Sequence, residues 1–222
     1  VDKVKGFGKK RHKLIGRKSL DASDASSEKV KKKNIGIIGS GIAASSAAYA
    51  AAQNGANVEI FESTDDIAGG ASGNPVAAMY PRFSVNNSPY SFLTAQGYFF
   101  AEKIYTQLPS AYRKTGLLFS HSNDYQEQWM LDMQNLNRAD LFEIINKKKM
   151  KQLYGFESHG LLVKEGGYLF PKLICKEMIT HPNIKVSYNH FFENWLKNKS
   201  KIDIQFKKKK KKSGFDVLII AN

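Results

Sequence analysis

Asn34–Ser45 reads NIGIIGSGIAAS, a short apolar segment that passes through a glycine turn into a run of small residues. This order predicts a strand, a tight turn and a helix. Gly39 allows the tight turn, Gly41 leaves room for the backbone to approach phosphates, and Ala44 allows the helix to pack closely on the strand. The start of such a helix directs free N–H groups and the positive end of its dipole at an anion. The stretch therefore predicts a site for the pyrophosphate of a dinucleotide.

The residues after this turn indicate which dinucleotide the site takes. A helix is expected from Ile42 to Asn54 and a second strand at Asn57–Glu62, which completes a βαβ unit. Glu62 lies about 20 residues beyond the turn, where a carboxylate accepts hydrogen bonds from a ribose diol and repels a 2′-phosphate. This favours NAD or FAD over NADP. The loop Gly69–Asn74 adds glycines, a serine and an asparagine, which suit a longer cofactor and favour FAD over NAD.

The positive charge of the chain is concentrated in two segments. The net charge is +14 over 222 residues. Residues 1–18 carry eight Lys or Arg and one Asp, and Lys207–Lys212 is a run of six lysines, so the remainder is nearly neutral. Such segments are compatible with a polyanionic partner such as RNA. A lysine run is more often a solvated loop, and a loop is the expectation for Lys207–Lys212.

The composition also indicates the cellular compartment in which the protein is expected. No apolar run reaches the roughly 18–20 residues of a membrane helix, and the basic N-terminal segment lacks the apolar stretch of a secretory leader. The single Cys175 cannot form an internal disulfide and is expected to be buried and inert. We therefore expect a cytoplasmic monomer without membrane contact.

The chain divides by composition into three parts. Residues 1–18 are basic, residues 19–33 have the composition of a linker, and a globular pattern covers residues 34–222. A mostly helical region with core aromatics is expected from Ser88 to Tyr154. Later strands are expected at about 160–170, 184–188, 202–206 and, buried, 216–221, with a helix at about 171–180. We predict an α/β fold, in which a Rossmann-type half carries an inserted α+β region at about 85–185 and is incomplete at the C-terminus.

Three segments then resemble the D-amino-acid-oxidase family of flavoproteins, which includes glycine-oxidase-like enzymes. The first is Gly70-Ala71-Ser72-Gly73-Asn74, taken with the glycine turn and Glu62. The second is Glu165–Pro171 (EGGYLFP), which resembles that family's strand and turn into the next helix. The third is Asp216–Asn222 (DVLIIAN), which resembles the strand that returns toward the flavin.

Within that family, the pattern is most similar to a branch that modifies tRNA. Its members follow an A-S-G-N motif closely with a tyrosine–proline pair, here Ala71–Asn74 and Tyr80-Pro81. Their N-terminal methyltransferase domain closes on a basic G-F-G-[KR]-[KR] stretch, here Gly6–Arg11. The resemblance implies that residues 1–18 are the tail of a methyltransferase domain, 19–33 a linker and 34–222 part of an FAD-dependent oxidoreductase domain. Ala44 in place of the third motif glycine, and the lysine run, depart from the pattern.

The resemblance implies an FAD-dependent oxidation at the wobble uridine of tRNA. The carboxymethyl group of 5-carboxymethylaminomethyl-(2-thio)uridine would be removed, and a methyltransferase domain using S-adenosylmethionine would methylate the amine. A hydride would pass to the flavin from the carbon next to the amine, and water would hydrolyse the imine. In such chemistry the protein mainly positions and tunes the cofactor. The sequence identifies no catalytic acid or base.

The candidate site residues follow from these motifs. Those expected to bind the cofactor are Gly39, Ser40, Gly41, Ile42, Ala43, Ala44, Glu62, Gly70, Ala71, Ser72, Gly73, Asn74 and Phe192. By the resemblance, Phe192 passes beside the adenine, and Arg82 and Tyr168 are candidates for substrate contact. The histidines lack the spacing of zinc ligands and are expected on the surface or in turns, so no metal is expected. These are the four histidines of the globular part, His121, His159, His181 and His190.

Two other functions remain open at this point. One is a flavin-dependent oxidase of a small amino acid or amine such as glycine or sarcosine, against which the Gly6–Arg11 stretch and the basic leader argue. The other is a non-catalytic RNA-binding fragment.

Overall fold

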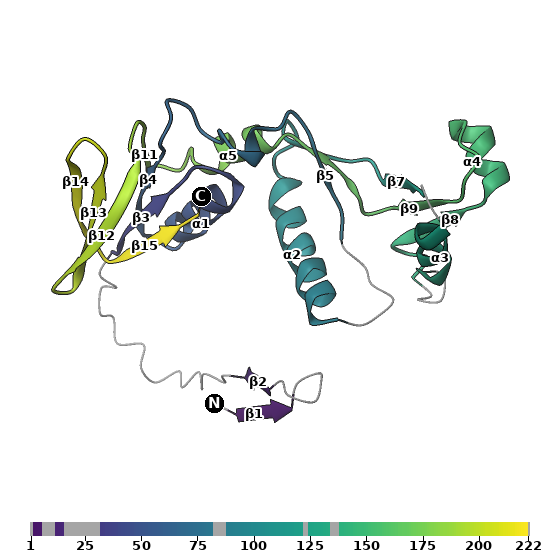
Figure 1. Ribbon diagram of the computed structural model, residues 1–222, viewed down its shortest axis with the longest axis horizontal. Helices are drawn as coiled ribbons and strands as arrows, with labels where there is room; N and C mark the ends of the chain where they lie inside the picture. Colours follow the sequence, from purple (N-terminus) through teal and green to yellow (C-terminus); the bar gives the residue numbers. More distant parts are fainter. Residues whose placement is uncertain are drawn as a thin grey trace. The chain divides into compact units, whose positions relative to one another are not determined.

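A computed structural model describes residues 2–5, 12–15, 32–81, 88–121, 124–133 and 138–221 of the chain. The chain divides into two units, residues 1–31 and residues 32–222. In the first unit, strands β1 (Asp2–Lys5) and β2 (His12–Ile15) form an antiparallel pair (Figure 1). The motif at Gly6–Arg11 lies outside the described residues.

The second unit is built on a parallel sheet of four strands, which confirms the predicted Rossmann-type half. In sheet order the strands are β11 (Ile184–Ser187), β4 (Asn57–Phe61), β3 (Asn34–Ile38) and β15 (Val217–Ile220). The strand expected to be buried at 216–221 instead lies at the edge of this sheet, and Ile220 is 53% exposed. It has one neighbour, β3, among the described strands.

Helices cover one face of the parallel sheet. Helix α1 (Ile42–Gln53) follows β3, and α5 (Pro171–Met178) packs beside it. Fully buried Ala44 and Ala48 of α1 pack with Ile37 and Ile60 of the sheet, because a methyl side chain lets helix and strand approach closely.

Cys175 of α5 lies buried against Ile67 and Ala68, as predicted. Burial raises the pKa of its thiol, which keeps the sulfur in its unreactive form. Among the described residues, none of the helices combines the length and apolarity that crossing a bilayer requires.

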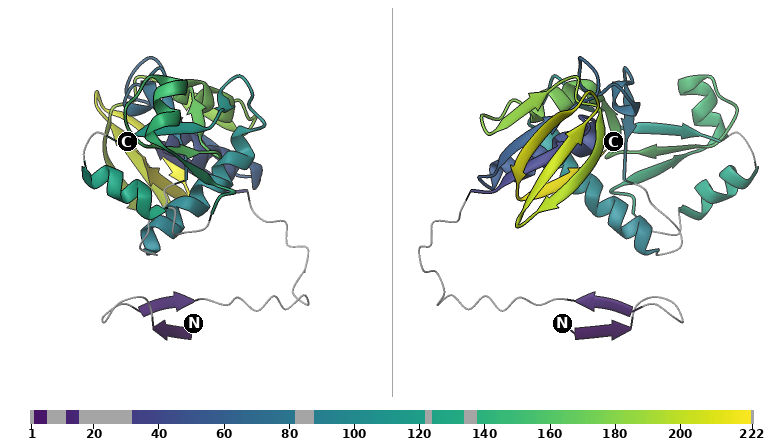
Figure 2. Two further views of the ribbon diagram at one scale, coloured as in Figure 1. Left: turned by 90° about the vertical axis from the view of Figure 1, so that its right-hand side faces the viewer. Right: turned by 60° about the vertical axis from the view of Figure 1, so that its left-hand side comes forward.

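An antiparallel sheet covers the other face of the parallel sheet (Figure 2). Its strands are β12 (Phe192–Asn198), β13 (Lys201–Phe206) and β14 (Lys210–Phe215). Ile204, Phe206 and Phe215 pack on Ile38 and Phe61. The fit is close at Gly36 of β3, where an added Cβ would lie 2.8 Å from Cδ1 of Ile204.

The lysine run forms the tip of this antiparallel sheet. Only residues 207–209 turn, and Lys210–Lys212 opens β14, so the expected solvated loop is wrong for half of the run. Lys208 and Lys209 both adopt positive φ angles, of 60° and 56°. Asn and Gly adopt this left-handed geometry more readily than lysine does in hairpin turns.

The inserted region contains more strand than expected. One sheet has the order β5 (Ala77–Met79), β10 (Gly167–Leu169), β6 (Tyr112–Lys114); the other has β7 (Leu117–Ser120), β9 (Gly160–Val163), β8 (Phe142–Ile145). The helices are α2 (Pro89–Tyr105), α3 (Asp124–Asp132) and α4 (Lys147–Tyr154), and a short 3-10 turn, η1, covers Ala71–Gly73. Helices α2, α3 and α4 still cover most of the described residues between 88 and 154, as predicted, but the strands β6, β7 and β8 among them were not expected. Strands β6, β7 and β8 are three or four residues long, too short to show a period of two.

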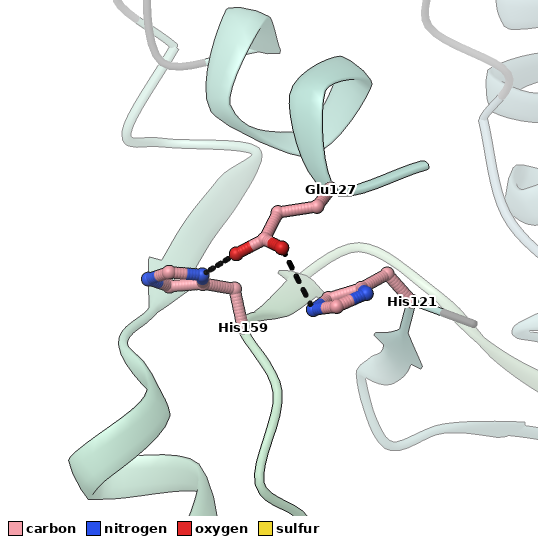
Figure 3. Close-up of side chains that lie close together, drawn as sticks. All are labelled: His121, Glu127 and His159. Carbon is pink, nitrogen blue, oxygen red and sulfur yellow. Dashed lines mark hydrogen bonds and ion pairs between the residues drawn. The ribbon is translucent and has the colours of Figure 1, made fainter. Parts of the chain in front are cut away.

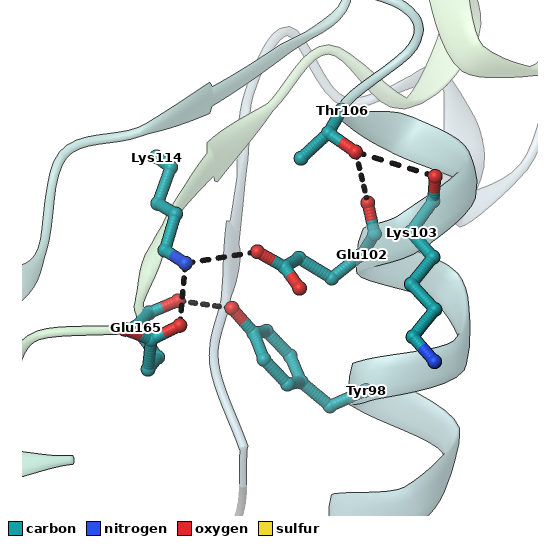
Figure 4. A network of polar contacts seen from close by, with 6 residues as sticks. All are labelled: Tyr98, Glu102, Lys103, Thr106, Lys114 and Glu165. Carbon is teal, nitrogen blue, oxygen red and sulfur yellow. Dashed lines mark hydrogen bonds and ion pairs between the residues drawn. The ribbon is translucent and has the colours of Figure 1, made fainter. Parts of the chain in front are cut away.

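A polar network fastens α2 to the neighbouring strands (Figure 4). The ammonium of Lys114 on β6 lies 2.9 Å from Oε1 of Glu102 on α2 and also pairs with Glu165 between β9 and β10. Tyr98 of α2 donates its hydroxyl to the Glu165 carbonyl. Burial raises the pKa of Tyr98, so the hydroxyl keeps its proton and remains a donor.

The aromatic side chains of α2 are divided between core and solvent. Tyr98 and Tyr105 are buried, as expected of core aromatics. The prediction is wrong for Tyr90, Phe92 and Phe100, which are 63–70% exposed.

Candidate dinucleotide-binding cleft

The predicted glycine turn lies at the carboxyl end of β3. Gly39 has a φ of 93°, which a side chain would strain, and its N–H donates to the carbonyl of Phe61 on β4 at 2.9 Å. Gly41 is the N-cap of α1 and has an ordinary extended backbone, so its lack of a side chain serves space rather than conformation. The first N–H of the helix, at Ile42, donates to Oγ of Ser72 at 3.0 Å. The N-terminus of α1 therefore faces the loop Gly69–Asn74, which the sequence analysis assigned to the same cofactor site.

Glu62 follows β4 and is held by a dense set of donors. Its Oε1 accepts from the Ser63 hydroxyl at 2.9 Å and from the N–H and hydroxyl of Thr64 at 3.1 and 3.2 Å. Its Oε2 accepts from the hydroxyl of buried Ser40, which itself accepts from Ala68 N–H at 2.9 Å. Burial would raise the pKa of Glu62, but the hydrogen bonds outweigh it and hold the pKa below its usual range. The carboxylate is therefore ionised and fixed at neutral pH.

The loop after β4 closes around these groups. Ser72 lies on η1, and an added Cβ at Gly41 would lie 3.2 Å from its Oγ. At Gly73, a Cβ would lie 2.6 Å from the carbonyl oxygen of Ala68, so this glycine is required by packing within the loop.

These segments surround a cleft of about 660 Å³. Ten of the predicted cofactor residues line it: Gly39, Ser40, Gly41, Ile42, Ala43, Glu62, Gly70, Ala71, Ser72 and Phe192. Three do not line it, because Ala44 is buried in the core behind the turn, and Gly73 and Asn74 shape the loop.

One of the two candidate substrate residues, Tyr168, is not part of this cleft. Tyr168 lies on β10 between Ala78 and Arg113, and does not line it. Arg82 lies outside the described residues.

The structure adds cleft residues that the sequence reasoning missed. Ser63 and Thr64 are hydroxyl residues directly after Glu62, and that adjacency was the available signal. His190 and Phe191 have no local signal, because the pairing of β11 with β4 brings them to the site.

His190 is partly exposed in the segment after β11, as expected, and it also lines the cleft. Its backbone N–H donates to the Glu62 carbonyl at 2.8 Å. Its ring packs 4.9 Å from Phe206 and 5.6 Å from Phe61, measured between centroids. Beside it, Phe191 is half exposed, and the Lys207 ammonium lies 4.0 Å from its ring centroid. His190, Phe191 and Phe192 thus form an aromatic wall at one side of the cleft.

The residues present fit the adenosine diphosphate half of a dinucleotide. A helix N-terminus supplies N–H groups for a pyrophosphate, the ionised Glu62 supplies acceptors for a ribose diol, and the aromatic wall suits a purine. The fold and the cleft together define a Rossmann-type dinucleotide-binding protein.

A family model described as FAD dependent oxidoreductase matches residues 34–181. The chain belongs to this family, which confirms the predicted flavoprotein class and FAD as the cofactor. It is an FAD-dependent oxidoreductase domain.

Curated relatives carry a more specific name. The tRNA 5-methylaminomethyl-2-thiouridine biosynthesis bifunctional protein MnmC of Hahella chejuensis is 28% identical over 85% of this chain and 31% of its own length. The protein of the same name from Campylobacter jejuni is 26% identical over 100% of this chain and 35% of its own length. The chain therefore spans about a third of the length of the curated relatives it matches.

Solved structures share the fold at low identity. Glycine oxidase from Geobacillus kaustophilus superposes with a TM-score of 0.71 at 12% identity, covering 86% of this chain and 56% of that chain. Iminodiacetate oxidase from Chelativorans superposes with a TM-score of 0.66 at 18% identity, covering 84% of this chain and 54% of that chain.

Proposed function

We propose that this chain is the cofactor-binding part of an FAD-dependent enzyme that removes the carboxymethyl group from 5-carboxymethylaminomethyl-(2-thio)uridine at the wobble position of tRNA. Its product, the 5-aminomethyl form, is the substrate for an S-adenosylmethionine-dependent methylation. The observation that carries the proposal is the cleft between α1 and Glu62, in a chain whose curated relatives are named for this tRNA modification.

The proposed domain boundaries support the same function. Residues 1–18 are the tail of a methyltransferase domain, residues 19–33 are a linker, and residues 34–222 belong to the flavin domain. The division of the chain between residues 31 and 32 supports a boundary close to Asn34. The basic segment 1–18 adds a positive charge that suits tRNA as the partner.

The roles of the residues follow from their positions. We assign the pyrophosphate to the start of α1, with Gly41 giving room and Ser72 beside it, and the ribose to Glu62. The aromatic wall, which includes Phe192, is assigned to the adenine. Gly39, Ser40, Ile42, Ala43, Gly70 and Ala71 complete the lining.

The chemistry itself belongs to the cofactor. FAD held at the start of α1 and at Glu62 would supply a two-electron oxidation at the carboxymethyl carbon beside the amine, and hydrolysis of the resulting C=N bond would release that unit as glyoxylate and leave the 5-aminomethyl group. The described residues of this chain bind and orient the cofactor. A substrate role for Tyr168 and Arg82 remains a proposal.

Reduction of the flavin under anaerobic conditions tests the substrate. The flavin-loaded protein is mixed with tRNA that carries the carboxymethylaminomethyl group, with unmodified tRNA, and with glycine or sarcosine. Bleaching of the flavin absorbance by modified tRNA alone is the expected result.

The other outcomes would contradict the proposal. Bleaching by glycine or sarcosine indicates a small-amine oxidase. Retention of tRNA without any yellow flavin indicates a non-catalytic RNA-binding chain.

A further inference from the structure

We propose that His121, Glu127 and His159 form a site for one zinc-type divalent cation, away from the dinucleotide cleft. Figure 3 shows the Glu127 carboxylate between the two imidazole rings. Its Oε1 lies 2.6 Å from Nδ1 of His159, and its Oε2 lies 3.5 Å from Nε2 of His121. One ligand atom from each residue lies within 4.8 Å of the other two.

The pairing of two strands brings the histidines together. In the β7–β9 ladder, Ser120 pairs with Gly160, so the next step of the same register sets His121 opposite His159. Residues that face each other across an antiparallel pair have Cβ atoms about 4.5–5.5 Å apart. Two imidazoles at this separation can bind one cation without a change in the backbone.

A packed core fixes the third ligand. Helix α3 carries Glu127, and its Met130 is buried together with Leu161 and Val163 of β9. The carboxylate is therefore placed over the two histidines by apolar packing, which gives the rigid support that a metal site requires.

His121 supplies an independent sign that a ligand is expected. Both of its ring nitrogens are buried and have no hydrogen-bond partner among the described residues. The 3.5 Å separation from Glu127 does not meet the geometry of a hydrogen bond. A buried nitrogen without a partner is costly, and a cation bound to Nε2 would remove that cost at one of the two atoms.

The donor set selects the class of cation. Two imidazole nitrogens and one carboxylate oxygen suit Zn²⁺, and three protein ligands leave a fourth position for water.

The present charge partner of the carboxylate is replaceable. The ammonium of Lys147 lies 3.1 Å from Oε1 of Glu127, and the Lys147 side chain is 55% exposed, so a cation can displace it into solvent. The three ligand side chains are 14–23% exposed, which leaves a route for the ion.

Zinc binding by the full chain tests the proposal. The protein is stripped with a chelator and dialysed against Zn²⁺, and its zinc content is measured by mass spectrometry. About one zinc per chain is expected. Cobalt should give the intense visible bands of a tetrahedral site, and zinc should raise the melting temperature.

Variants separate this site from adventitious binding. His121→Ala, His159→Ala and Glu127→Gln should each weaken zinc binding by at least about tenfold. His181→Ala is the matched control, because His181 bonds the backbone N–H of Asn183 outside this cluster, and it should bind zinc as the wild type does.

Two results would overturn the proposal. The first is a folded wild-type chain that retains no zinc. The second is equal zinc retention by the wild type and by the double variant His121→Ala/His159→Ala. Glu127→Gln keeps the shape of the side chain, so its melting curve without metal identifies any loss that comes from misfolding.

Discussion

The dinucleotide cleft and the His121–Glu127–His159 cluster are built in opposite ways. Most of the cleft comes from three continuous segments, residues 38–43, 61–64 and 69–72. The cluster joins one residue of α3 with the residue that follows β7 and the residue that precedes β9, and 38 positions separate its two histidines in the sequence. A site made of contiguous residues is visible as a motif. A site made by strand register becomes visible only when the pairing is known.

The cleft itself also combines a part that is contiguous in the sequence with a part that is not. The phosphate and ribose side is local in sequence, whereas the wall at 190–192 comes from beyond β11, more than a hundred residues later. Substitutions can show whether the phosphate and ribose side alone governs cofactor binding, and whether the cleft and the His121–Glu127–His159 cluster are independent.

The largest effect is expected from Gly41→Val. The γ-methyl groups of valine would occupy the space between the start of α1 and Ser72, where even a Cβ lies 3.2 Å from Oγ. The protein should be purified without flavin, as measured by its visible absorbance. The control is Gly97→Ala on α2, where a Cβ meets nothing within 4 Å and flavin content should be unchanged. A yellow Gly41→Val protein would show that the pyrophosphate lies elsewhere.

A smaller loss is expected from Glu62→Gln. A charged hydrogen bond contributes about 1.5–3 kcal/mol, so FAD affinity should fall roughly 10- to 100-fold in a titration. Glu59→Gln is the matched control, because Glu59 lies on β4 three residues before Glu62 but bonds Ser187 and Lys212 and does not line the cleft. Equal affinity of wild type and Glu62→Gln would contradict the assignment of the ribose.

The contribution of ionised Glu62 to the stability of the fold should depend on pH. The folded-state pKa is depressed, so its contribution is present above the unfolded-state value of about 4.5 and is lost as the pH falls through the folded-state pKa. Melting temperatures of flavin-free wild type and Glu62→Gln should therefore converge as the pH falls below 4.5. A difference that stays constant with pH would indicate that ionised Glu62 does not stabilise the fold.

The smallest effect on the cofactor is expected from Glu127→Gln. This variant removes the charge that holds His159 and Lys147, so the metal-free melting temperature should fall slightly. Its flavin content should equal that of the wild type, because Glu127 does not line the cleft. Loss of flavin in this variant would show that the two sites are coupled.

The sequence was informative where a residue's neighbours in the chain are also its neighbours in space. Strands β3 and β4, helix α1 and nine of the cleft residues were predicted from one motif and the segments that follow it, whereas Phe192 came from the family resemblance. The Gly39 turn and the Ala44 contact follow from local geometry, so no tertiary information was needed.

The sequence was misleading where pairing across the chain decides the outcome. Strands β12 and β14 were missed, since lysine and asparagine have low strand propensity and only their packing on the parallel sheet stabilises them. His121 and His159 are far apart in the sequence, and only the register of β7 and β9 brings them together. The strand β15 was expected to be buried because it is apolar, whereas its position in the sheet leaves it at an edge.

The left-handed turn at Lys208 and Lys209 is an expected site of proteolytic cleavage. Both lysines are exposed at a hairpin tip, so trypsin should cleave there. Strands β13 and β14 remain hydrogen-bonded and share buried Ile204, Phe206 and Phe215. A nicked chain should therefore stay assembled as two fragments, and the hairpin tip is a natural place at which to split this protein into complementing halves.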